Sequence, residues 1–446
     1  MASKDLFSVG ISLIVIVALI LSSNIESFSS EIGSQHTIPK NNTGPQSGLS
    51  IFMNLYPQRL GKDFKLVDFL QKLKLNSNEP MWNGLYNSQG QRSLWVEKKL
   101  RPIIIVPGLC ATPIWSRSGE TWNPFWGKVV PKDSSTIINA DDVITTTQEF
   151  GSLDFDPPEY MDILINALEA KGYVKGSNLF GAGYDSRLIG SQNEINQWCL
   201  SLTRLIEKVC ADQENPAIII GHDLGSQCAN YFLVGAIQEW KDKYIQSFIS
   251  ISGTFGGTPK ALRTILSGEP GASFTINDTV KNFSGLSLML PEPRIWGDNP
   301  LVHFNQVSYS SYDLEKLINQ VSSDAALVYK IVKPIREQSM QAPGVPVYIM
   351  CGDDLNTESS YNYGMSLSDD PQQNLPFYML DLPSNQKFNY PDYFNGDGTV
   401  PRFALEWSIW WSKYQPQPVY FKFFTGAEHT KILSMFEPIR YLLDII

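Results

Sequence analysis

The sequence predicts an α/β protein with a mostly parallel β-sheet covered by helices on both faces. From residue 101 onward, short continuous apolar runs alternate with segments of helical periodicity. Continuous apolar runs are typical of parallel strands, because both faces of such strands are buried. The repeated alternation of strand and helix is the pattern of a layered α/β domain.

Five apolar runs are predicted strands. They are Ile103–Val106, Ala217–Ile220, Phe248–Ile251, Val347–Met350 and Val419–Phe424. The first run ends at Pro107-Gly108, and residues 258–344 interrupt the alternation between the third run and the fourth. We interpret that interruption as an insertion that caps the sheet.

Three helices are predicted between these strands. Apolar residues from Tyr160 to Leu168 recur at helical spacing, and Gly172 can end that helix. Ser191 with Glu194 forms a capping box that opens a helix with one apolar face through Val209. The third predicted helix runs from Gly225 to Glu239.

Composition and charge exclude some classes of function. The 446 residues are 43% hydrophobic and 18% charged, which is ordinary for a folded protein with a sizeable core. The net charge of -10 comes without a Lys/Arg cluster, so nucleic acid is not an expected partner. Of the five cysteines, Cys199 and Cys210 share one predicted helix and are too far apart for a disulfide. We expect few disulfides, no metal and no cofactor.

The N-terminal segment predicts the secretory route. Lys4 precedes the apolar run Phe7–Leu21, and small polar residues follow, as in a signal peptide of residues 1–24. The alternative is a membrane anchor at residues 7–21, although that run is shorter than the about 20 residues that span a bilayer. Sequons at Asn41, Asn277 and Asn282 fit a secreted or lumenal protein. Residues 25–99 are interpreted as an N-terminal extension, and residues 100–446 as the main domain.

A strand-to-helix turn carries the strongest functional signal. The predicted strand at Ala217–Ile220 runs into Gly221-His222-Asp223-Leu224-Gly225 and then into a helix. This G-x-x-x-G arrangement is that of the nucleophile elbow in α/β-hydrolases, where small residues flank a strained turn. The residue at the nucleophile position is Asp223, where that motif has serine.

Two further residues complete a catalytic arrangement in the expected chain order. Asp397 lies in a Gly-rich loop, and His429 directly follows the last predicted strand. Nucleophile, acid and histidine follow in this order in α/β-hydrolases. We therefore expect Asp223, Asp397 and His429 to converge, with His429 between two carboxylates that raise its pKa.

Short motifs are spread from about residue 101 to 445. They are Arg101-Pro102-Ile103-Ile104-Ile105-Val106-Pro107-Gly108, Tyr184-Asp185-Ser186-Arg187-Leu188, the elbow Gly221–Gly225, Trp240–Tyr244, Phe248–Gly253 with Phe255-Gly256-Gly257, Gly396–Val400 and Gln415–Val419. Together, in this order, they resemble the lecithin:cholesterol acyltransferase and lysosomal phospholipase A2 family.

The resemblance implies an α/β-hydrolase fold with a lid and a lipid-binding face. It implies acyl transfer from a phospholipid through an acyl-serine to a sterol, another lipid alcohol or water. It assigns Asp397 and His429 as acid and base, and Phe150 and Leu224 to the oxyanion hole. It places Trp122, Phe125 and Trp126 in a lid at about residues 110–150, which lacks the family's lid disulfide.

Asp223 leaves three hypotheses open. The first is an acyl-lipid enzyme of this family that works weakly or not at all, because a carboxylate attack on an ester gives a mixed anhydride. The second is a pseudoenzyme that binds lipid. The third is an aspartate-nucleophile hydrolase, in which the carboxylate attacks an sp³ carbon.

Overall fold

The computed structural model describes residues 100–112, 115–118, 121–124, 143–144, 150–153, 155, 160–267, 280–304, 307–364 and 393–446. The predicted signal peptide, the alternative anchor, the N-terminal extension and the sequons at Asn41 and Asn277 lie outside these residues. Within the described part of the chain, no helix has both the length and the apolar character needed to cross a bilayer.

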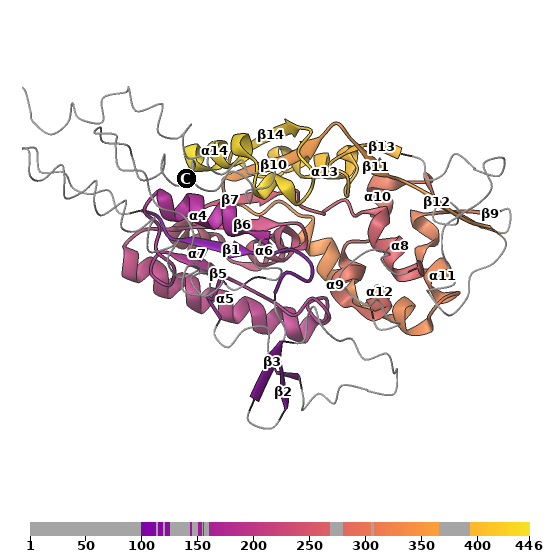
Figure 1. Cartoon of the computed structure of the whole chain (residues 1–446), viewed down its shortest axis with the longest axis horizontal. Helices are drawn as coiled ribbons and strands as arrows, with labels where there is room; N and C mark the ends of the chain where they lie inside the picture. The colour runs from indigo at the N-terminus through magenta and orange to yellow at the C-terminus, as the bar shows by residue number, and fades with distance from the viewer. Residues whose placement is uncertain are drawn as a thin grey trace, which may run out of the picture. The chain divides into compact units, whose positions relative to one another are not determined.

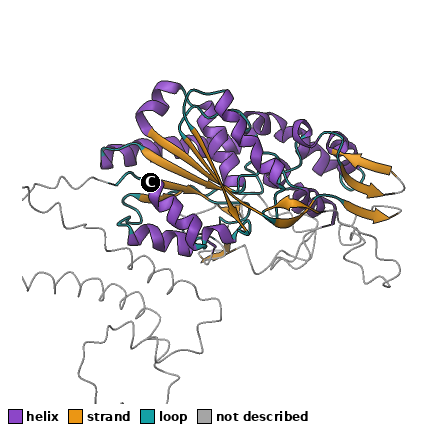
Figure 2. Cartoon of the chain, turned by 90° about the horizontal axis from the view of Figure 1, so that it is seen from above, coloured by secondary structure: helices purple, strands orange, loops and turns teal. Residues whose placement is uncertain are grey.

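A six-stranded parallel sheet is the centre of the domain (Figures 1 and 2). Its order is β14 (Val419–Thr425), β10 (Val347–Asp353), β7 (Ile245–Ile251), β6 (Ala217–His222), β1 (Ile103–Val106) and β5 (Leu179–Gly181). Each neighbouring pair is parallel. All five predicted strands are therefore confirmed, and β5 is a sixth strand in addition to them.

Both faces of the sheet are buried, as the continuous apolar runs predicted. In β1, Ile104 belongs to one hydrophobic cluster and Ile103 and Ile105 to another. The first cluster includes residues of α5 (Gln192–Gln213) and α6 (Leu224–Gly235), and the second those of α4 (Asp162–Ala170) and α14 (Phe436–Ile445). Because successive side chains of a strand point to opposite faces, this division shows helices on both sides of the sheet.

The predicted helix from Gly225 to Glu239 is wrong in its extent. The chain forms α6, which ends at Gly235, and a separate α7 (Gln238–Tyr244). Ala236 and Ile237 between them are extended, with ψ of 141° and 149°. The predicted start of α5 is confirmed, since the Ser191 side chain accepts a hydrogen bond from the Glu194 N–H at 3.3 Å.

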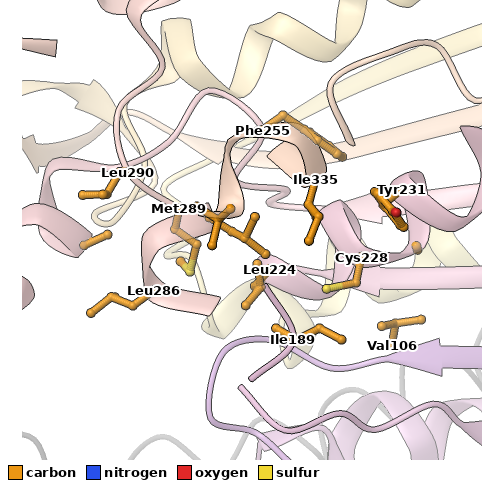
Figure 3. Packing of buried hydrophobic residues seen from close by; sticks show 14 of the residues in the cluster. Val106, Ile189, Leu224, Cys228, Tyr231, Phe255, Leu286, Met289, Leu290 and Ile335 are labelled. Atoms are coloured by element: carbon orange, nitrogen blue, oxygen red, sulfur yellow. The ribbon is translucent and has the colours of Figure 1, made fainter. Parts of the chain in front are cut away.

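The segment between β7 and β10 is largely helical and packs on the elbow helix. It contains α8 (Pro259–Ser267), α9 (Ser284–Leu288), α10 (Pro293–Trp296), α11 (Leu314–Asn319) and α12 (Ser323–Ser339). Figure 3 shows Leu224 of α6 among Leu286, Met289 and Ile335 of this segment. A Cβ at Gly285 would lie 3.0 Å from Leu224 Cδ2, so α9 lies directly against the start of α6.

Smaller sheets and short helices surround the central sheet. One sheet contains β3 (Thr121–Pro124), β2 (Trp115–Ser118) and β4 (Val143–Ile144). A second contains β12 (Tyr361–Gly364), β8 (Pro300–Phe304) and β9 (Val307–Ser310). A third pairs β11 (Leu355–Glu358) with β13 (Tyr393–Gly396). The short helices are α13 (Arg402–Leu405), η2 (Val280–Asn282), η3 (Ser311–Asp313), η7 (Glu406–Lys413) and η8 (Lys431–Leu433). The antiparallel pair β11–β13 leads directly into the loop that carries Asp397.

Candidate active site

Asp223 lies on a strained turn between β6 and α6. Its backbone has φ 53° and ψ -126°, a conformation that L-residues rarely adopt. The surrounding packing leaves no room for larger flanking residues. A Cβ at Gly225 would lie 2.2 Å from the Pro107 carbonyl oxygen, and one at Gly221 would lie 2.7 Å from Ser226 Cα. The turn is therefore the predicted nucleophile elbow.

The three predicted catalytic residues converge at this turn. His429 Nε2 lies 3.2 Å from Asp223 Oδ1, and His429 Nδ1 lies 2.7 Å from Asp397 Oδ2. The side chains are buried, with exposed fractions of 6% for Asp223 and His429 and 0% for Asp397. The predicted geometry, with the imidazole between two carboxylates, is what the structure has.

Backbone groups hold Asp397 in place. Its Oδ1 accepts hydrogen bonds from the N–H groups of Thr399 at 3.0 Å and Val400 at 2.7 Å. Its carbonyl oxygen accepts one from the His429 N–H at 2.9 Å. Gly398, with φ 86°, provides the left-handed residue of the loop. The carboxylate that orients the imidazole is thus fixed by the local fold.

The second oxygen of Asp223 is held by the loop that follows β1. Asp223 Oδ2 accepts a hydrogen bond from the Leu109 N–H at 2.9 Å. Such a donor beside the nucleophile of an α/β-hydrolase is placed to bind the oxyanion of a tetrahedral intermediate. Sequence reasoning missed Leu109; the Pro107-Gly108 turn at the end of the first strand was the available signal.

Electrostatics couple the imidazole to both carboxylates. Burial alone lowers the pKa of His429, but the charge of Asp397 and the hydrogen bonds to both carboxylates raise that pKa to about 10. Burial alone raises the pKa of Asp223, but the hydrogen bond and the charge of His429 bring it below its usual value. At neutral pH the resting site therefore contains a carboxylate at the nucleophile position and an imidazolium at the base position.

The other predicted site residues are placed as follows. Leu224 is the first residue of α6 and is fully buried. Phe150 is half-buried against the core beside β5, where the next residue's carbonyl oxygen accepts a hydrogen bond from the Gly181 N–H. Its oxyanion role stays a prediction. Trp122 lies within β3, and Phe125 and Trp126 lie outside the described residues.

The predictions for the cysteines and for the remaining sequon have the following outcome. Cys199 and Cys210 share α5 as predicted, and none of the five cysteines forms a disulfide. Asn282, which ends η2, is half-buried.

The parallel sheet, the elbow and the Asp–His pair define an α/β-hydrolase-fold protein. The lecithin:cholesterol acyltransferase family model matches residues 144–327, which include the elbow. The human lysosomal phospholipase A and acyltransferase is 27% identical over 295 residues, covering 64% of this chain and 66% of that protein. The lecithin-cholesterol acyltransferase-like 1 protein of Arabidopsis thaliana is 31% identical over 257 residues, covering 52% of this chain and 59% of that protein.

Over the matched residues, the chain is similar to the lecithin:cholesterol acyltransferase family and to these two relatives. The matched segments span less than two thirds of the length of either relative. Among solved structures, a chain of the Tle4–Tli4 complex is similar with 12% identity and a TM-score of 0.48, covering 77% of this chain and 97% of that one.

Proposed function

We propose that this protein binds phospholipid acyl esters and that Asp223 suppresses acyl transfer in a site otherwise arranged for it. The single observation that carries the proposal is the double engagement of one carboxylate. Asp223 Oδ2 occupies the Leu109 N–H, and Oδ1 pairs with His429. The donor and the base that a substrate would need are both bonded to the enzyme's own side chain.

A serine at this position would have a complete set of partners. Neutral His429 would take the hydroxyl proton while the serine Oγ attacks the ester carbonyl of the phospholipid. The Leu109 N–H and the predicted Leu224 N–H would stabilise the resulting oxyanion. His429 would then protonate the lysophospholipid oxygen as the acyl-serine forms. Attack by water or a lipid alcohol, again with His429 as base, would release the acyl group.

Asp223 opposes each of these steps. Its negative charge lies at the donor that should receive the oxyanion, and its attack on an acyl ester would give a mixed anhydride. The same charge helps to keep His429 protonated, with a pKa of about 10, and an imidazolium has no lone pair with which to accept a proton.

An aspartate-nucleophile hydrolase is the alternative that the contacts of Asp223 leave open. One carboxylate oxygen held by Leu109 and the other directed to the base would suit attack on an sp³ carbon. As the carboxylate oxygen bonds to the carbon, the leaving group would depart with the electron pair of its bond. The resulting alkyl ester would remove the charge of Asp223 and lower the pKa of His429, so that His429 could activate the water that cleaves the ester. The family relationship favours acyl esters as ligands.

The decisive experiment compares the wild type with Asp223→Ser and Asp223→Asn. Phosphatidylcholine vesicles serve as acyl donor, released fatty acid and acylated alcohol are measured, and vesicle flotation measures binding. We expect all three proteins to bind vesicles, with acyl release at least about 1,000-fold faster in Asp223→Ser than in the wild type. Robust acyl release by the wild type that Asp223→Asn abolishes would contradict the proposal and establish a working aspartate nucleophile. Vesicle binding by an inactive Asp223→Ser protein would support a pseudoenzyme.

We also propose a secreted or lumenal location, including the lysosome. The predicted signal peptide supports it, and the human relative is named as lysosomal. The intact mass of protein from a glycosylating eukaryotic host provides the test. Loss of the first 20 to 25 or so residues together with added glycan mass is expected, whereas an unprocessed, unglycosylated chain would contradict it.

A further inference from the structure

A half-buried tyrosine and a buried histidine beside the triad take no part in the chemistry described above. Tyr160 precedes α4, and His222 is the last residue of β6, directly before Asp223. The exposed fraction of His222 is 2%, and its ring centroid lies 5.5 Å from that of Tyr160 and 5.1 Å from that of His429. His222 is not the general base of the proposed acyl transfer, because His429 already occupies that position.

The two side chains connect three separate loops of the site. The Gly108 N–H donates to the Tyr160 hydroxyl at 3.0 Å. The Tyr160 hydroxyl bonds His222 Nδ1, and His222 Nε2 bonds the His429 carbonyl oxygen at 3.0 Å. The series therefore runs from the residue next to Leu109, across the elbow, to the main chain of the catalytic histidine.

Each hydrogen bond in this series has one possible direction. Burial, with the charge of His429, lowers the pKa of His222 to about 4, and burial beside Asp223 raises the pKa of Tyr160 well above its usual value. Both side chains are therefore neutral at physiological pH. A carbonyl oxygen only accepts, so His222 Nε2 carries the proton, and Nδ1 accepts from the tyrosine O–H. The tyrosine oxygen in turn accepts from the Gly108 N–H.

We propose that Tyr160 and His222 are positioning residues that hold the Leu109 N–H and the His429 ring in register with the elbow. The distances support this function. Gly108 lies so close to the site that a Cβ on it would be 2.9 Å from the Tyr160 hydroxyl and 3.0 Å from Asp223 Oδ2. A shift of Gly108 thus moves the neighbouring N–H that binds Asp223. The catalytic consequence rests on the proposed acyl transfer, but the positioning itself does not.

Hydrogen exchange in the otherwise wild-type protein tests the positioning without requiring activity. Tyr160→Phe removes one oxygen and leaves the Gly108 N–H and His222 Nδ1 without their partner. We expect exchange of the Leu109 amide to become at least about tenfold faster, as expected when a local opening costs about 1.4 kcal/mol less. The matched control is Tyr173→Phe, which changes a buried tyrosine of the hydrophobic cluster against which Tyr160 packs. Equal exchange of Leu109 in wild type and Tyr160→Phe would overturn the proposal, as would an equal increase in the control.

A second variant guards against a general loss of packing. His222→Gln keeps a donor near the His429 carbonyl oxygen but lacks the ring acceptor for Tyr160, so it should also accelerate Leu109 exchange. In the Asp223→Ser background, Tyr160→Phe should lower kcat about 10- to 100-fold with little change in KM, because misplaced groups act at the transition state. A rise in KM alone would contradict positioning. If Asp223→Ser is inactive, the proposed function fails while the exchange result still decides this inference.

Discussion

Two buried histidines lie side by side in this site, and the pKa of one is lowered while that of the other is raised. His222 and His429 have exposed fractions of 2% and 6%, and their ring centroids are 5.1 Å apart. Yet the pKa of His222 is about 4 and that of His429 about 10. The nitrogens of His222 bond a phenol and a carbonyl oxygen, whereas those of His429 bond two carboxylates. Burial lowers the pKa of both rings, and only His429 has carboxylate partners that overcome this effect.

The difference assigns a separate task to each ring. A neutral imidazole with two uncharged partners has a fixed tautomer and can hold loops together over a wide range of pH. An imidazolium between two carboxylates holds both of them by charge attraction and hydrogen bonds. His429 would become a general base only after one of its carboxylates is removed, and Asp223 occupies the position at which the elbow motif of α/β-hydrolases has serine.

The largest expected effect comes from removing the other carboxylate. In the Asp223→Ser background, we expect Asp397→Asn to lower kcat by about 10⁴, because the asparagine no longer orients His429 or stabilises its protonated form. Asp397 also accepts two backbone hydrogen bonds, which an asparagine oxygen can retain. Acyl-release assays with circular dichroism on both proteins would measure the effect. A decrease below about tenfold would mean that Asp397 has no part in the revived reaction.

The second-largest expected effect is a lower pKa of His429 when Asp223 is replaced. Asp223→Ser is expected to lower the pKa of His429 from about 10 by about two units, since one of two flanking charges is lost. NMR titration of the imidazole protons measures this pKa directly. The pKa of His222, which bonds no carboxylate, serves as the internal reference and should change by less. An unchanged pKa of His429 would show that Asp397 alone keeps it protonated.

The raised pKa of His429 also has a consequence for stability. Its folded pKa lies above the unfolded value of about 6.5, so the native state holds the proton more tightly. The contribution is fully present below the unfolded pKa and is lost as pH rises through about 10. In Asp223→Ser the decrease should be smaller and should end at a lower pH, because only the folded pKa of His429 changes. Urea unfolding at a series of alkaline pH values would detect both differences.

The sequence predicted which side chains converge in the site better than it predicted their supporting contacts. Strand periodicity and the glycines at 221 and 225 located the elbow, and chain order brought Asp397 and His429 to it. Those signals are local in the sequence, so they can be recognised without knowledge of the packing. Leu109 and Tyr160 act through a backbone N–H and a single hydroxyl, and neither role leaves a mark on residue type that a sequence pattern reveals.

The errors in the predicted fold have a similar cause. The break between α6 and α7 falls at Ala236-Ile237, two residues that fit a helix but whose backbone is extended here. The strand β5 is short, and Gly181 in it lies so close to the backbone of Ser152 that a Cβ there would be 2.0 Å from the Ser152 carbonyl oxygen. Close backbone contacts of this kind are tertiary, so periodicity alone does not predict them.

The smallest expected effect is a loss of free energy of unfolding at acidic pH that depends on His222. Its folded pKa of about 4 lies below the unfolded value of about 6.5, so the unfolded chain binds the proton first as pH falls. Stability is therefore lost on acidification through this window, by about 1 kcal/mol for His222 between about pH 6 and pH 5. Other buried groups titrate in the same range, so the informative quantity is the difference between wild type and His222→Gln in urea unfolding at each pH. Glutamine has no proton to bind there, and the variant's slope should be shallower by that amount. Parallel slopes would mean that His222 is already protonated in the native state, and that the neutral series from Gly108 to His429 does not exist as described.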